Sequence, residues 1–138
     1  MYISTDTSQL DIALVHQFLS EQSPWAKGIS LATVQRSIEY SLCFGGYIDG
    51  RQIAFARVVT DKATFAYLMD VFVLPAYREQ GYAKTLMHAV QAHPDLQEIR
   101  RFILVSSSAR GLYEKFGFQP PIKPETFMEI NRPDIYQR

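Results

Sequence analysis

The N-terminal part of the chain has a short strand-like pattern followed by a helix-like one. The segment YIST (residues 2–5) is long enough for one short strand. Apolar residues then recur at the spacing of one helical face, which predicts an amphipathic helix. These residues are Leu10, Leu14, Val15 and Phe18. Ser8 and Asp11 have the spacing of a capping box, in which a side-chain oxygen accepts from an early helix amide.

The segment SPWAKGIS (residues 23–30) interrupts this helix with a proline and a glycine. A second helix is expected after Ser30, because Leu31, Val34 and Ile38 are spaced three and four residues apart. The sequence therefore predicts two helices in the first forty residues, joined by a connection that contains Trp25.

Three strand-like segments follow. LCFGGYI (residues 42–48) and RQIAFARVVT (residues 51–60) are joined by Asp49-Gly50. Both turn residues tolerate positive φ, which predicts a tight hairpin. FAYLMDVFVLP (residues 65–75) is almost wholly apolar. Such a strand is expected to be buried on both faces and to lie centrally in the sheet.

The second half alternates helices and strands. A helical stripe is formed by Ala83, Leu86, Met87 and Val90. RFILV (101–105) predicts a strand, ARGLYEKF (109–116) a short helix that Gly117 ends, and FMEI (127–130) a last strand. Strands that occur both as a hairpin and in alternation with helices predict an α/β fold of the α+β type. We expect one mixed sheet with helices on its faces, in a single domain spanning residues 1–138.

Composition narrows the function classes. The 14 Lys and Arg residues balance the 14 Asp and Glu residues, which argues against broad electrostatic binding to nucleic acid or to a membrane surface. The single cysteine, Cys43, excludes an internal disulfide framework and a cysteine-rich zinc site, and no metal is expected. No apolar run reaches the length of a membrane span, and no signal peptide is recognisable. We therefore expect a cytoplasmic protein.

The segment REQGYA (residues 78–83) stands between the apolar strand and the next helix. The first amides of a helix have no intrahelical partner and carry partial positive charge, so a phosphate can accept from several of them. Gly81 would let the backbone approach a ligand closely, and Arg78 and Lys84 would add positive charge at the rim. The alternative is that Gly81 only makes a strand-to-helix turn.

Two longer stretches carry a family resemblance. MDVFVLPAYREQGYAKTLMHAV (residues 69–90) resembles the acetyl-coenzyme A binding segment of the GNAT N-acetyltransferases, a central strand followed by an Arg/Gln-x-x-Gly-x-Gly/Ala loop and a helix. ARGLYEKFGF (residues 109–118) is similar to the C-terminal motif of that family, and the two occur in the family's order. The resemblance covers nearly the whole chain and implies a mostly antiparallel central sheet with helices on both faces.

The resemblance implies how acetyl-coenzyme A (acetyl-CoA) would bind. Backbone amides of the loop would hold its pyrophosphate, and main-chain groups of the preceding strand would pair with its pantetheine arm. The loop residues implied are Arg78, Glu79, Gln80, Gly81, Tyr82, Ala83 and Lys84, and the strand residues are Val71, Phe72 and Val73. Many relatives have an asparagine that contacts the cofactor where this chain has Ser106, whose side chain is shorter.

Acetyl transfer to an amine requires a deprotonated amine, a donor for the developing negative charge on the thioester oxygen, and a proton for the leaving thiolate. Tyr113 lies at the position of the family's general acid, and its alternative role is an amphipathic core residue. The amide of Val71 would polarise the thioester carbonyl. Asp70 is either the general base or a buried partner of an arginine such as Arg57.

We expect Trp25 and Tyr67 to form walls of the pocket that binds the acceptor amine. The family generally transfers the acetyl group directly in a ternary complex, so Cys43 need not be a nucleophile. The sequence thus predicts an N-acetyltransferase acting on a primary amine, first of all of a small molecule. The alternatives are a non-catalytic coenzyme A-binding module with the same fold and, more remotely, a nucleotide-binding protein. The family also makes a homodimer an option.

Overall fold

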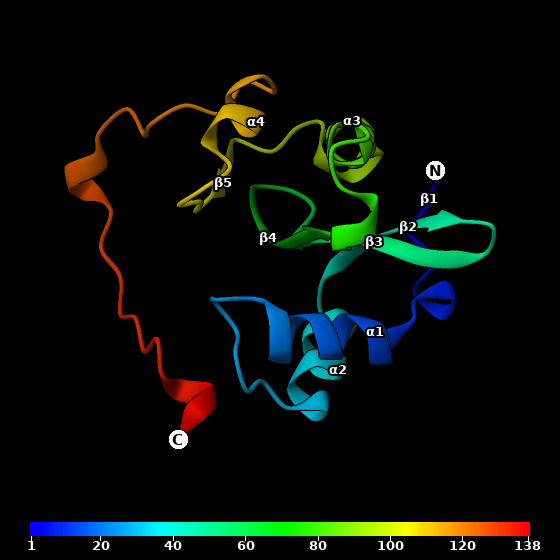
Figure 1. The fold of residues 1–138 in the computed structure, drawn as a ribbon. Helices are drawn as coiled ribbons and strands as arrows, with labels where there is room; N and C mark the ends of the chain where they lie inside the picture. The colour runs from blue at the N-terminus through cyan, green and yellow to red at the C-terminus, as the bar shows by residue number, and fades with distance from the viewer.

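The computed structural model describes all residues, 1–138. Its strands and helices follow the predicted order closely (Figure 1). The strands are β1 (Tyr2–Ser4), β2 (Leu42–Ile48), β3 (Arg51–Thr60), β4 (Phe65–Val73) and β5 (Arg101–Leu104). The helices are α1 (Ile12–Gln17), α2 (Leu31–Glu39), α3 (Tyr82–Ala92) and α4 (Arg110–Glu114). A π-helical segment, Phe18–Gln22, continues α1.

All five strands form one sheet in the order β1-β2-β3-β4-β5. The first three pairings are antiparallel and the last, between β4 and β5, is parallel. This confirms the predicted α/β fold with a mixed, mostly antiparallel sheet. The β2–β3 hairpin turns at Asp49 (φ 49°) and Gly50 (φ 77°), as the Asp-Gly pair predicts.

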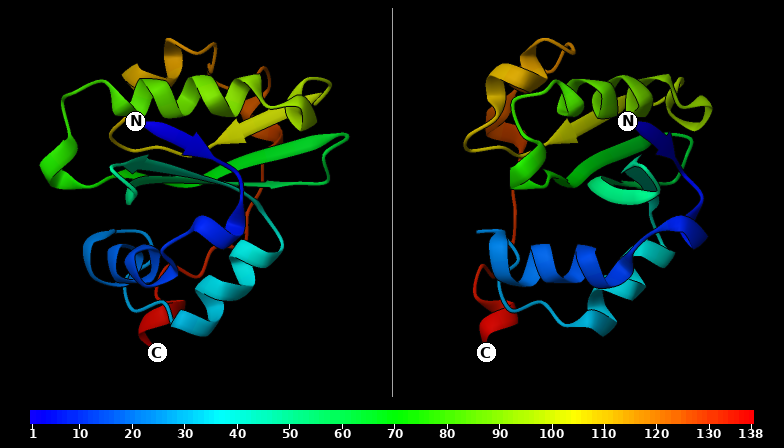
Figure 2. Two further views of the ribbon diagram at one scale, coloured as in Figure 1. Left: turned by 90° about the vertical axis from the view of Figure 1, so that its right-hand side faces the viewer. Right: turned by 45° about the vertical axis from the view of Figure 1, so that its right-hand side comes forward.

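The sheet lies between two helical layers. Figure 2 shows α3 and α4 over one face of the sheet and α1 and α2 over the other. Strand alternation supplies an apolar surface to each layer, so that Ala54 and Val58 belong to the core under α3, whereas Phe55 belongs to the core under α1 and α2. On the second face the rings of Phe18 and Phe72 stack with centroids 4.0 Å apart, which fixes the π-helical end of α1 against β4.

The capping box predicted from Ser8 and Asp11 is wrong. Helix α1 starts at Ile12, with Asp11 itself as the N-cap, and an Asp11 carboxylate oxygen accepts from the amide of Leu14. Ser8 instead lies in a separate turn capped by Asp6. Two acidic residues within six positions each begin a helical turn, because an Asp side chain satisfies early amides at least as well as serine does. The second helix is capped by Ser30, as expected.

Strand β4 is flanked on both sides over only half of its length. It pairs with β3 almost throughout, but β5 pairs only with Phe65 to Leu68 and then ends at Leu104. The prediction of a central strand buried on both faces therefore holds only in part, since several side chains from Tyr67 to Val71 are half-buried. The end of β4 keeps one free backbone edge.

The last predicted strand, residues 127–130, is also wrong. Residues 119–138, here called the C-terminal arm, form no strand, and every one of them is exposed. The arm begins with Pro120 and Pro121, which cannot donate to a sheet, and it leaves the sheet after α4 without pairing with β5. It then runs outside β5 toward the level of α1 and α2 (Figure 1).

The far end of the arm rests on the connection between the first two helices. A Cβ atom at Gly28 would lie 2.6 Å from the carbonyl oxygen of Tyr136, so only glycine leaves room for this backbone contact. Gly28 also has a φ of 82°, which a side chain would strain. None of the helices is long and apolar enough to span a membrane.

The packing of α2 gives a first prediction. Ile38 is buried under the sheet, whereas Leu31, on the same helix, is exposed. We expect Ile38→Ala to lower the free energy of unfolding by about 2–4 kcal/mol, because it removes apolar contacts and leaves a cavity. Leu31→Ala is the control and should cost about 0.5 kcal/mol or less. Urea unfolding measures both, and equal costs for the two variants would contradict this assignment of the core.

Candidate functional site

The turn from β4 to α3 holds two residues in the left-handed backbone region. Glu79 has φ 64°, and Gly81, the N-cap of α3, has φ 85°. Gly81 adopts this conformation without steric cost, and a Cβ atom there would meet nothing within 4 Å. The glycine is therefore required by backbone conformation and not by crowding within the chain.

This conformation leaves a run of backbone amides without partners. No N–H group from Glu79 to Lys84 donates a hydrogen bond to another atom of the chain, and the ladder of α3 starts only where Thr85 N–H donates to the Gly81 carbonyl at 3.2 Å. Six consecutive donors thus lie at the positive end of the α3 dipole. Such an arrangement suits an anion with several oxygen acceptors.

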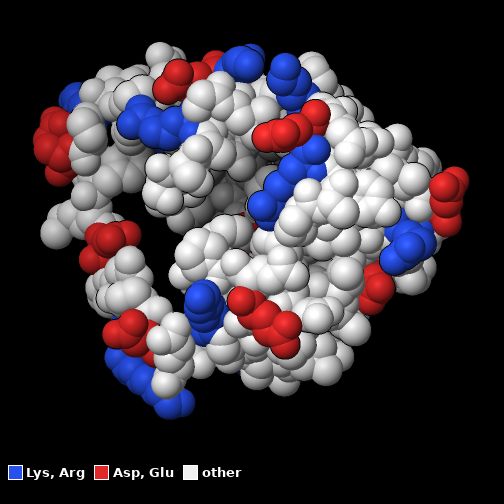
Figure 3. Space-filling view, in the orientation of Figure 1, with Lys and Arg blue, Asp and Glu red and all other residues white.

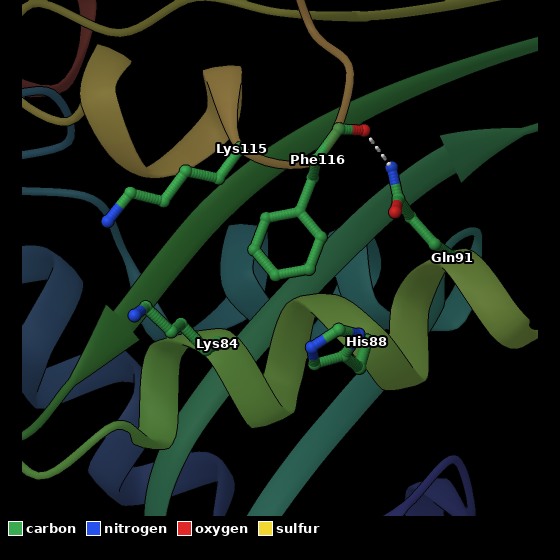
Figure 4. A pocket seen from close by; sticks show the side chains of 5 residues that line it. All are labelled: Lys84, His88, Gln91, Lys115 and Phe116. Carbon is green, nitrogen blue, oxygen red and sulfur yellow. Dashed lines mark hydrogen bonds between the residues drawn. The ribbon is translucent and has the colours of Figure 1, made fainter.

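Two lysines lie beside this turn. Lys84 on the first turn of α3 and Lys115 just after α4 line a shallow pocket of about 430 Å³ together with His88, Gln91 and Phe116. Figure 4 shows the side-chain nitrogens of both lysines on the same side of this pocket. The Gln91 amide donates to the Phe116 carbonyl at 2.7 Å and ties α4 to α3. Sequence analysis missed Lys115, although it stands within the motif GLYEKFGF.

Arg78 does not extend over the turn. Its Nε donates to the carbonyl of Val73 at 3.0 Å, so the Arg78 side chain lies against the end of β4. Its charge still lies at the start of the turn. The contact also means that the Val73 carbonyl already has a donor.

The free edge of β4 begins where β5 stops. Phe72 faces Phe55 of β3, and the amide of Leu74 donates to the Ile53 carbonyl. Since backbone groups alternate in direction along a strand, those of Phe72 point toward β3 and those of Val71 and Val73 point away from it. Val71 and Val73 therefore present the backbone groups that an extended ligand could pair with, and Phe72 contributes its buried ring.

A β-bulge in β4 turns Asp70 to the same face of the sheet as Met69. The register with β3 shifts between Phe55 and Arg57, where one residue opposes two on β4. Asp70 takes up the extra residue with φ 53°, a conformation that aspartate tolerates better than most residues. Both Met69 and Asp70 consequently contact Arg57, on the sheet face that carries α1 and α2.

Both carboxylate oxygens of Asp70 have partners. Oδ2 accepts from Arg57 Nε at 2.8 Å, and Oδ1 accepts from Trp25 Nε1 at 2.9 Å. The Arg57 and Asp70 side chains are only 12% and 8% exposed, and Arg57 also donates to Ser41. The structure thus contains the arginine pairing that sequence analysis weighed against a general base. The network anchors the exposed Trp25 to the sheet.

Tyr67 lies on the same sheet face, opposite Ile103 of β5. The bulge and the alternation of β4 place Tyr67, Met69 and Asp70 on one side, with Trp25 reaching them from the connection between the first two helices. The two residues predicted to wall the acceptor side, Trp25 and Tyr67, are therefore on the same face of the sheet.

Tyr113 lies on the opposite face, in the apolar cluster that contains Val73 and Leu86 and against which Val71 packs. Its ring meets Phe118 edge-on, and its hydroxyl makes no hydrogen bond within the chain. Burial raises the pKa of Tyr113 above its ordinary value of about 10. The phenol therefore stays protonated at neutral pH and can donate a proton.

Ser106 and Cys43 have structural partners. The Ser106 hydroxyl accepts from the amide of Ala109 at 2.9 Å and so stabilises the turn before α4. Burial raises the pKa of Cys43 to about 12, so its thiol is protonated and poorly nucleophilic at neutral pH. No group of three or more His, Cys, Asp or Glu side chains in the structure could hold a metal ion.

Comparisons with known proteins agree with this geometry. The family model described as an acetyltransferase (GNAT) domain matches residues 39–120. A candidate acetyltransferase of Gibberella zeae is 26% identical over 136 residues, which cover 82% of this chain and 75% of that protein.

Two solved structures are similar over nearly the full length. A candidate GNAT acetyltransferase of Xanthomonas campestris pv. campestris is 59% identical, covers 99% of this chain and 96% of its own, and superposes with a TM-score of 0.97. A candidate acetyltransferase of Deinococcus radiodurans is 19% identical, with a TM-score of 0.73 over 96% of this chain and 89% of its own. The loop, the helix α3 and the Tyr113 motif all fall within the matched family segment, and the chain belongs to the GNAT acetyltransferase family.

Proposed function

We propose that this protein transfers an acetyl group from acetyl-CoA to a primary amine of a small-molecule acceptor, directly and in a ternary complex. The observation that carries the proposal is the run of six unpartnered amides from Glu79 to Lys84, which adjoins the free edge of β4. Bound acetyl-CoA would supply an activated thioester as the acetyl donor.

The residues around the turn fit the phosphates of this donor. The six amides and the α3 dipole would hold the pyrophosphate, and Gly81 leaves that surface open. Lys84 and Lys115 would neutralise further phosphate charge from the neighbouring pocket. Arg78 would support the turn from its position on the Val73 carbonyl.

The free edge of β4 fits an extended amide-containing chain. The backbone of Val71, which points away from β3, would pair with the pantetheine arm, and the Val71 amide would donate to the thioester oxygen as negative charge develops there. The Val73 carbonyl would take part only if Arg78 releases it. A donor bound in this way would lie between β4 and β5, beside the face that carries Asp70 and Trp25.

Tyr113 would complete the transfer as general acid. As the amine nitrogen bonds to the acetyl carbon and the carbon–sulfur bond breaks, Tyr113 would donate its phenolic proton to the leaving sulfur, and it would regain a proton from water afterwards. The raised pKa of the buried tyrosine keeps that proton available, and its hydroxyl has no competing partner in the chain. The protonated, buried Cys43 supports direct transfer over an acyl-cysteine route.

We assign Asp70 a positioning role. Its two oxygens are engaged by Arg57 and Trp25, so it would hold Trp25 on the face of the sheet that carries Tyr67. The proton of the acceptor amine would then leave to water.

Turnover separates this proposal from a non-catalytic coenzyme A-binding module. Free-thiol release should be measured with acetyl-CoA against a panel of amino acids, polyamines, aminoglycosides and peptides. The proposal predicts release that depends on one class of small amine. Tight coenzyme A binding without release across the whole panel would favour the module.

Gly81→Ala tests the phosphate turn. Alanine in the left-handed conformation costs about 1–2 kcal/mol, which the chain can avoid only by moving the amides. We expect at least tenfold weaker coenzyme A binding in a calorimetric titration. Gly50→Ala is a matched control, because Gly50 is also left-handed with nothing within 4 Å but lies in the β2–β3 hairpin. Equal affinities for both variants would argue against phosphate binding at the turn.

Tyr113→Phe tests the general acid. The substitution keeps the ring and removes the proton donor, so kcat should fall about 100-fold or more while coenzyme A affinity stays within about twofold. Because burial raises the pKa of Tyr113, wild-type activity should show no loss from tyrosine ionisation below about pH 10. A variant with unchanged kcat would exclude Tyr113 as the proton donor.

Asp70→Asn tests the positioning role. Loss of the buried charge pair should lower the free energy of unfolding by about 3 kcal/mol, whereas Glu114→Gln, which removes an exposed pair with Arg110, should cost about 0.5 kcal/mol or less. The KM for the acceptor amine should rise. The fall of kcat toward acidic pH, the acid limb of the kcat–pH profile, should remain as in the wild type. Disappearance of that limb together with a large fall in kcat would instead identify Asp70 as the general base.

A further inference from the structure

The side chain of Arg78 occupies a backbone group that the free edge of β4 would otherwise offer to a ligand. Its Nε donates to the Val73 carbonyl at 3.0 Å, and this is the only hydrogen bond that the side chain makes within the chain. The backbone groups of Val73 point away from β3, toward the edge that β5 leaves open after Leu104. Arg78 therefore caps this edge in the free protein.

A short 3-10 turn, Pro75–Tyr77, brings Arg78 back over the end of its own strand. The amide of Tyr77 donates to the Leu74 carbonyl at 2.9 Å, which closes the turn directly after β4. The Arg78 side chain can therefore reach a carbonyl five residues earlier in the chain. A charged side chain placed over an open strand edge discourages pairing with another strand.

The guanidinium of Arg78 is not neutralised by a carboxylate. None of the ion pairs of the structure involves Arg78, and its Nη groups make no hydrogen bond within the chain. Arg78 is exposed and directly precedes the six unpartnered amides. Figure 3 views α3 from its N-terminal end and shows basic side chains at the border of a hollow on this face. A diphosphate on the amides would attract this free charge away from the Val73 carbonyl.

The two halves of coenzyme A would meet Arg78 differently. The pantetheine half has amide N–H groups that need a carbonyl on the strand edge, but it has no charge that attracts an arginine. Pantetheine alone has to displace the guanidinium from Val73 and leaves it with water as its only acceptor. Complete coenzyme A replaces the lost hydrogen bond with a charge-assisted one from Arg78 to a phosphate oxygen.

We propose that Arg78 is a specificity-determining residue that makes binding of the pantetheine arm depend on the diphosphate. In the free protein Arg78 caps the Val73 carbonyl. When a diphosphate binds to the amides from Glu79 to Lys84, the guanidinium turns to its oxygens and frees that carbonyl for the arm. The protein thereby selects coenzyme A thioesters over thioesters carried on pantetheine without a diphosphate. This inference rests on the proposed use of acetyl-CoA.

Titration of coenzyme A and of pantetheine into ¹⁵N-labelled wild type and Arg78→Met tests the proposal. Methionine keeps an unbranched side chain but removes the donor and the charge. Pantetheine should bind the variant about threefold to tenfold more tightly than the wild type, because the Val73 carbonyl no longer has to be released. Coenzyme A should bind the variant no more tightly than the wild type, because the phosphate contact is lost together with the cap.

The side-chain resonance of Arg78 follows the hydrogen bond itself. Its Nε–H signal is identified by its absence from the spectrum of Arg78→Met. The signal should move when coenzyme A saturates the wild type, because the guanidinium exchanges the Val73 carbonyl for a phosphate oxygen. A signal that stays in place at saturation would overturn the proposal.

Arg36→Met is the matched control. It removes an exposed arginine of α2, in the helical layer on the other face of the sheet from α3, and should leave both affinities unchanged.

Pantetheine that binds Arg78→Met no better than the wild type would reject the proposal, since the Val73 oxygen would then accept from both donors. Equal tightening for both ligands would also reject it, because Arg78 would then obstruct the edge without selecting a ligand. Both results leave the proposed acetyl transfer standing. Coenzyme A that binds neither the wild type nor the variant would instead reject the proposed function, and this inference with it.

Discussion

The candidate site depends on one local constraint, the left-handed conformation of Gly81 at the start of α3. It turns the chain from β4 into the helix so sharply that six successive amides find no acceptor in the protein. Unpartnered donors at an exposed helix start are satisfied by water in the free protein, and an anion can replace that water at little cost. Lys84 and Lys115 lie on one side of these amides, and the end of β4 lies on the other. The proposed roles of both depend on an anion that binds to the amides.

Strand β4 has two irregular features within a few residues. Its pairing with β5 ends at Leu68, which frees the outer edge at Val71 and Val73, and its bulge at Asp70 turns a carboxylate toward Arg57 and Trp25 on the other face. These two features of one strand therefore lie beside the proposed acetyl-CoA edge and the proposed acceptor surface. A regular strand would place Asp70 on the side opposite to Met69 and could not give Trp25 its anchor on the sheet.

Local patterns predicted most of the fold. The bounds of β2 and β3, the Asp49-Gly50 turn and the Ser30 cap follow from hydrophobic periodicity and turn chemistry, which act over a few residues. The pairing of Asp70 with Trp25, 45 residues away, could not be read from spacing, because it depends on a bulge that only tertiary packing fixes. The segment FMEI has the composition of a strand but pairs with no strand of its own chain, so propensity alone overestimated the sheet.

Residue-specific amide spectroscopy tests the central claim most directly. Coenzyme A should be titrated into the ¹⁵N-labelled protein, with pantetheine, which lacks the diphosphate, as the comparison. The account predicts that the amide resonances of Glu79 to Lys84 move strongly with coenzyme A and little with pantetheine, because the diphosphate accepts from those donors. Binding of coenzyme A that leaves these six resonances in place, or that shifts them equally with pantetheine, would contradict it.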